Sequence, residues 1–90
     1  MRDIDQIIRS ITQIYPAVTA RQLSVSHPGV DDDGLWFFQR AGSEFEVQIE
    51  SSTGMVPFLI ETDESDARLT AKSINETLEI LTKLLHLEPQ

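Results

Sequence analysis

The chain has 90 residues, with 15 acidic residues against 7 basic ones, so its net charge at neutral pH is −8. It has no cysteine, which excludes disulfides and thiolate metal sites, and no apolar run approaches the ~18 residues of a membrane-spanning helix. We therefore expect one small domain over residues 1–90, soluble and cytoplasmic, because the N-terminus also lacks the apolar segment of a signal peptide.

The N-terminal segment has the pattern of an amphipathic helix. Apolar residues recur there at spacings of three and four, which places them on one helix face: Ile4, Ile7, Ile8, Ile11, Ile14 and Tyr15. Asp3 and Gln6 have the spacing of a capping box, and Pro16 ends the helix. The pattern of Thr19–Ser26 then predicts a first strand, and the Pro, Gly and Asp residues of His27–Gly34 indicate a long exposed loop.

Three stronger strand patterns follow. Leu35–Arg40 is rich in aromatic residues, and a short turn over Ala41–Ser43 connects it to Glu44–Ser51, which alternates most regularly. A second turn leads into Met55–Thr62, where Pro57 favours either an edge position or an irregular first half. Because the connections are short, we expect these strands to form an antiparallel meander.

The C-terminal part predicts a second helix. Residues 67–72 fit either a further strand or the approach to that helix, and the pattern leaves both open. Ser73–Glu76 is a capping box, and an apolar stripe continues to a helix end near His86. The predicted fold is α+β in two layers: an antiparallel meander of three to five strands, of undetermined order, with the N-terminal and C-terminal helices packed on one face.

The uncovered face of such a sheet is the candidate site. A sheet covered on one side alternates apolar and polar residues, but only Glu44–Ser51 does so cleanly. If Leu35 and Phe37 face the helices, the two aromatic residues between and after them face away and join a row of polar side chains. The predicted partner-binding residues are Trp36, Phe38, Glu44, Glu46, Gln48, Glu50 and Leu59.

Two alternative arrangements would also account for the apolar residues of this face. In one, the long loop or the chain after Asp66 covers Trp36 and Phe38 within one subunit. In the other, a homodimer through the same face buries them, although it would bring glutamates of like charge together.

The charge distribution indicates the chemistry of a partner. Residues 31–66 contain ten acidic residues and one base, Arg40, whereas residues 1–30 have a net charge of +1 and residues 67–90 of zero. Charge concentrated in this way favours a basic protein and repels polyanions, so we expect neither nucleic-acid nor membrane binding.

Catalytic and metal-binding motifs are weak. Asp31–Gly34 resembles the start of an EF-hand loop, but that register places Gly29 and Arg40 at ligand positions, which leaves only non-specific binding of divalent cations open. His86 is expected to interact with the C-terminal dipole of the second helix. His27, close to Ser24 and Asp31, keeps a small hydrolase as an alternative, but the sequence has no nucleophile elbow and no phosphate loop. We expect no enzyme, no cofactor and no metal.

Three segments carry a resemblance to a known class of proteins. Gly34–Phe38, Glu46–Gly54 and Pro57–Glu61 together resemble the core of small acidic bacterial α+β proteins of the immunity-protein type. The resemblance implies a protein that inhibits a toxin by masking its basic site with an acidic surface. Small acidic secretion chaperones, which are usually dimeric, offer a similar balance of acidic and strand residues, although this chain is shorter.

Overall fold

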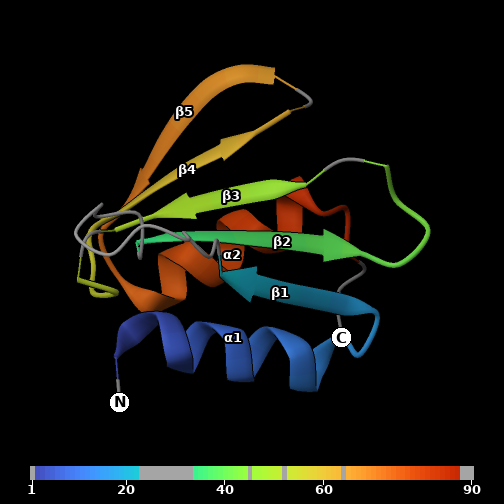
Figure 1. The fold of residues 1–90 in the computed structure, drawn as a ribbon, viewed down its shortest axis with the longest axis horizontal. Helices are drawn as coiled ribbons and strands as arrows, with labels where there is room; N and C mark the ends of the chain where they lie inside the picture. Colours follow the sequence, from blue (N-terminus) through green and yellow to red (C-terminus); the bar gives the residue numbers. More distant parts are fainter. Residues whose placement is uncertain (1, 23–33, 45, 52, 64, 88–90) are drawn as a thin grey trace, which may run out of the picture.

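The computed structural model describes residues 2–22, 34–44, 46–51, 53–63 and 65–87, and its fold is the predicted α+β arrangement (Figure 1). Within these ranges, two helices and five strands follow one another in chain order: α1 Asp3–Ile14, β1 Val18–Gln22, β2 Leu35–Arg40, β3 Val47–Glu50, β4 Phe58–Thr62, β5 Ser65–Ala71 and α2 Ile74–Leu84. Most of the loop predicted over His27–Gly34, with His27 and Asp31–Asp33, lies outside the described residues, as does the second half of the strand predicted over Thr19–Ser26.

The sheet is the predicted antiparallel meander. Its strands lie in sequence order, so β1 and β5 form the two edges. Residues 67–72, for which the sequence allows two structures, belong mostly to β5. Pro57 follows a cis peptide bond and precedes β4, which starts at Phe58 between β3 and β5. The irregular first half is therefore confirmed, and the edge position is wrong.

Both helices pack on the same face of the sheet and share one core with it. Alternate residues of the strands face the helices, and the buried apolar side chains are Ile4, Ile7, Ile11, Val18, Trp36, Phe38, Val47, Ile49, Phe58, Ile60, Ala71, Leu81 and Leu85. The opposite face is covered by neither helix, as the sequence predicts for a two-layer domain.

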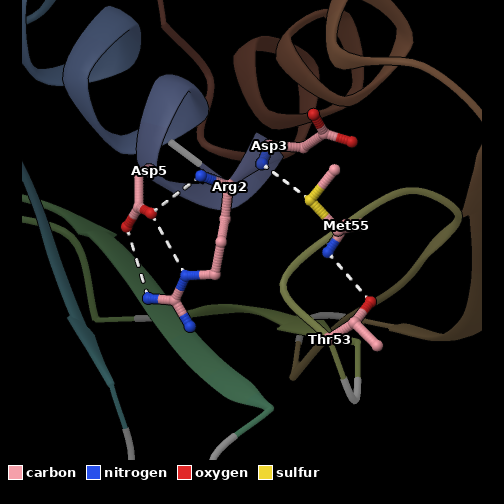
Figure 2. Close-up of polar contacts among 5 residues, drawn as sticks. All are labelled: Arg2, Asp3, Asp5, Thr53 and Met55. Atoms are coloured by element: carbon pink, nitrogen blue, oxygen red, sulfur yellow. Dashed lines mark hydrogen bonds and ion pairs between the residues drawn. The ribbon is translucent and has the colours of Figure 1, made fainter.

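The start of α1 is attached to the segment before β4 (Figure 2). The backbone N–H of Ile4 donates to the carbonyl of Gly54 at 2.9 Å, and that of Asp3 donates to the Met55 sulfur at 3.5 Å. The N-cap residue is Arg2, whose backbone N–H and guanidinium both donate to the carboxylate of Asp5. The expected capping box of Asp3 and Gln6 is therefore wrong by one position: Arg2 and Asp5 form it.

The ends of α2 follow the sequence signals closely. Ser73 is the N-cap, and its hydroxyl accepts from the Glu76 N–H at 3.0 Å. His86 does not lie in the last helical turn, as expected, but just after the helix, in the left-handed region with a φ of 55°. Its N–H donates to the Lys83 carbonyl, and the next N–H, of Leu87, donates to the Thr82 carbonyl. This pair of hydrogen bonds forms a Schellman motif, in which glycine is the commonest residue at the position of His86.

Candidate protein-binding surface

Trp36 and Phe38 do not lie on the uncovered face, so their predicted role as anchors for a partner is wrong. Their exposed fractions are 3% and 0%, and both belong to the core under the helices. Their neighbours across the strand pair, Ile49 and Val47, are buried as well. The two aromatic residues are thus buried within one subunit, but on the face that the helices cover, which differs from both alternative arrangements considered from the sequence.

A one-residue difference in register explains the reversal. A three-residue turn over Ala41–Ser43 would pair Arg40 with Glu44 and therefore Phe38 with Glu46. In the structure Phe38 pairs with Val47, because the connection between β2 and β3 extends to Glu46. Opposite residues of an antiparallel pair point to the same face, so a shift of one residue moves every side chain of β2 to the other side.

We define the open face as the side of the sheet turned away from the helices. The strand registers place alternate residues on it: Thr19, Arg21, Leu35, Phe37, Gln39, Gln48, Glu50, Leu59, Glu61, Arg68 and Thr70. Phe37 and Leu59 are half-buried there and form apolar surface between charged side chains. Of the predicted residues, Gln48, Glu50 and Leu59 therefore lie on the open face, as expected.

The other two predicted glutamates differ in position. Glu46 lies immediately before β3, beside Phe37 and Gln48, and belongs with the open face. Glu44 is exposed within the connection from β2, so it does not continue the row of glutamates on β3.

A depression of about 250 Å³ lies at the end of the open face where β3 begins and β4 ends. Its walls mix one aromatic ring with carboxylate and amide groups: Phe37, Glu46, Gln48, Glu61, Thr62 and Asp63. Small-molecule sites commonly measure about 300–1,000 Å³. The depression is thus somewhat smaller than the usual range of small-molecule sites.

Arg21 of β1 reaches across to this depression. Its guanidinium carbon lies 4.6 Å from the centroid of the Phe37 ring, and its Nη2 lies 3.3 Å from Oε2 of Glu46. The side chain remains 63% exposed, so solvent weakens both contacts. The arrangement combines an aromatic face with a carboxylate, a pair of groups that suits the flat guanidinium better than an ammonium group.

Two further contacts hold the carboxylates of the depression. Asp63 accepts a hydrogen bond from the backbone N–H of Glu46 at 3.2 Å, which fixes the start of β3 against the end of β4. Glu61 lies 3.7 Å from the Arg68 guanidinium on the neighbouring strand. The candidate site predicted from the sequence does not include Glu61, Asp63, Arg68, Arg21 or Phe37, because only the strand register shows that they lie on the same face.

Nothing in the described part of the chain resembles a metal centre. No group of three or more His, Cys, Asp or Glu side chains there could hold a metal ion. His86, the one histidine in the described ranges, lies at the end of α2, and its carbonyl accepts from Arg40 at 2.9 Å. The predicted hydrolase alternative depends on His27 and Asp31, which are outside those ranges.

Comparison with protein-family models, with curated proteins and with solved structures finds no match to this chain. Across the described residues, neither helix has the length and apolar character needed to cross a bilayer.

Proposed function

We propose that the chain is a non-enzymatic binding module whose open face engages a basic protein, as an immunity-type inhibitor does when it masks a basic site. The observation that carries this proposal is the placement of Arg21 over Phe37 and beside Glu46. A guanidinium of this chain already contacts two residues that line the depression, and it shows which chemistry the surface accommodates.

A partner would present an arginine to the same groups. Phe37 offers its ring face, while Glu46, Glu61 and Asp63 supply negative charge around it. Arginine satisfies both requirements at once, because its planar guanidinium stacks on a ring while its N–H groups donate to carboxylates. Phe37 thus takes the anchoring role that the sequence assigns to Trp36 and Phe38.

The charge of the whole chain supports the same partner. The net charge is −8, and the excess of acidic residues falls within residues 31–66, which include β2, β3 and β4. A surface of this kind attracts a basic protein from a distance and accelerates the encounter. The local contact at Phe37 then provides selectivity.

The proposal is tested with two synthetic peptides that differ only in carrying arginine or lysine on a glycine–serine scaffold. Titration of the labelled protein, followed by NMR, should show tighter binding of the arginine peptide, with the largest shifts around Phe37 and Glu46. Phe37→Ala should weaken binding roughly threefold to tenfold, the range of one partly exposed cation–π contact.

A matched pair of variants locates the site. Glu46→Gln and Glu44→Gln remove the same charge, but only Glu46 lines the depression. Glu46→Gln should weaken arginine-peptide binding more than Glu44→Gln. Equal effects of the two variants would show that the peptide senses only net charge, and no binding of either peptide would remove the proposed function.

A further inference from the structure

We propose that two copies of this chain pair edge to edge through β5, so that their sheets join into one around a two-fold axis. The proposal is independent of the proposed function, because it uses an edge of the sheet and leaves the open face uncovered. Four observations lead to it: an unpaired edge, an apolar groove beside that edge, local charge neutrality and a self-complementary charge order.

The first observation is the edge itself. In the described part of the chain, β5 has β4 as its only strand neighbour, so the backbone groups along its other side have no strand partner. At the opposite edge, β1 lies beside α1. The end of β5 lies beside α2, whereas its first part extends away from both helices (Figure 1). An unpaired strand edge is a template for another strand.

The second observation is an apolar groove between β5 and α2. Leu69 pairs with the buried Ile60 and so belongs to the helix-facing side of the sheet, yet it is 39% exposed. Ile80 and Leu84 of α2 line the same groove, which measures about 360 Å³. A strand added beside β5, with its own covering helix, would bury these three side chains as the strands on either side of β4 and the helix layer bury Ile60.

The third observation selects a second copy as the occupant. Two chains of charge −8 repel each other, and a contact through residues 31–66 would bring acidic residues together. Residues 67–90, which contain most of β5 and all of α2, have a net charge of zero. A contact between two copies in this part of the molecule therefore adds no like-charge repulsion of its own.

The fourth observation is the order of charges along α2. Glu79 and Lys83 both line the groove, one turn apart. A two-fold axis that pairs β5 with its copy in antiparallel fashion also sets the two α2 helices antiparallel. With the axis level with Leu81, Lys83 of one copy lies opposite Glu79 of the other, twice by symmetry, so the surface is complementary to itself.

The pairing has a consequence for the open face. A two-fold axis perpendicular to the sheet keeps both helix layers on one side and both open faces on the other. Two arginine-binding depressions would then share one surface, and a partner with two basic sites could engage both, with the gain in affinity that linkage provides.

Sedimentation equilibrium over a range of concentrations tests the proposal, because it measures the monomer–dimer equilibrium of the full chain. Leu69→Asp should raise the dimer dissociation constant by at least about tenfold, since it places a charge in the apolar groove. Ile14→Asp is the matched control: Ile14 is also exposed, at 46%, but lies at the end of α1, far from β5 (Figure 1). A wild-type chain that is monomeric at every concentration would overturn the proposal.

A mixing experiment tests the orientation. Lys83→Glu and Glu79→Lys each place like charges opposite each other in a homodimer, so each variant alone should dimerise more weakly than the wild type. Mixed together, the two variants restore two opposite-charge pairs and should form a heterodimer. Because the chains are separate, a change of stability within one chain cannot produce this rescue. A mixture that associates no better than its components would rule out the antiparallel pairing of α2.

Discussion

The side chains of Arg2 and Asp5 form an ion pair at the start of α1. The Arg2 Nε lies 3.1 Å from Oδ2 of Asp5, and the Arg2 backbone N–H donates to the same oxygen (Figure 2). The hydrogen bond from the Arg2 side chain is the main cause that lowers the pKa of Asp5 below its ordinary value of 3.8. The charged form of Asp5 therefore supports the start of α1.

This contact predicts a pH dependence with a definite sign. Since the pKa of Asp5 is lower in the folded than in the unfolded chain, its stabilisation is present above the ordinary aspartate pKa and is lost as the pH falls through the lowered value. A carbon-detected NMR titration should find the Asp5 midpoint below 3.8, and Arg2→Ala should move it upward. Arg9→Ala, which removes the same charge from α1, should leave it in place. An identical midpoint in wild type and Arg2→Ala would contradict this assignment.

Individual residues also show where sequence reasoning ends. Leu35–Phe38 are four consecutive apolar residues, so either alternate pair satisfies a buried face. The choice depends on the register against β3, where Trp36 pairs with Ile49, and the register depends on the length of the connection. Glu46, Gln48 and Glu50 alternate with apolar residues, so the sequence alone assigns them to the open face. Phe37 lies in a run of apolar residues, so the sequence does not show which face it is on.

At the scale of elements, two glycines in the described part of the chain have a positive φ, and they occupy very different surroundings. Gly54 has a φ of 75°, and a Cβ there would lie 2.9 Å from the Arg2 Cδ and 3.1 Å from the Ile4 Cγ2. Gly42 has a φ of 85°, and a Cβ there would meet no atom within 4 Å. Gly54 therefore allows α1 to approach the segment before β4, whereas Gly42 serves only its own turn.

Alanine substitutions at these two positions should separate the free-energy cost of a left-handed backbone from that of the steric contacts of the added Cβ. Gly42→Ala should lower the free energy of unfolding by about 1 kcal/mol, the cost of an L-residue in the left-handed region. Gly54→Ala should cost about 1–3 kcal/mol more, because Ile4 and Arg2 must also move. Urea denaturation measures both values. If the two variants were equally stable, the start of α1 would not be held against Gly54.

The sequence predicts the elements themselves to different degrees. Both helices have a full apolar stripe and a stop or cap signal, and their bounds agree with Asp3–Ile14 and Ile74–Leu84 within a few residues. The sequence pattern does not show whether β5 is a strand, because an edge strand needs few apolar residues. Leu69 and Ala71 lie there among polar neighbours, and only the pairing with β4 identifies the strand. β3 is shorter than its alternating pattern, because Glu46 instead forms part of the connection.

For the whole molecule, the sequence alone identifies the α+β class, the two-layer arrangement and the concentration of negative charge in the middle of the chain. The structure adds that two arginines of the open face already contact carboxylates there: Arg21 lies beside Glu46, and Arg68 beside Glu61. An incoming arginine must therefore compete with the Arg21 side chain for Phe37 and Glu46. The proposed partner binds an acidic surface of the molecule, whereas the proposed second copy binds a neutral one.

Salt should therefore affect the two proposed associations differently. Raising the ionic strength from about 0.01 M to about 0.15 M shortens the screening length from about 30 Å to about 8 Å. Binding of the arginine peptide should weaken and its association rate should fall, because attraction to a chain of charge −8 is screened. Dimerisation through β5 should stay the same or become tighter, because the same screening reduces repulsion between the copies. Stopped-flow and sedimentation measurements over one salt series give both trends. A dimer that dissociates with salt as the peptide does would show that attraction between opposite charges, rather than burial of the neutral apolar edge, holds the copies together.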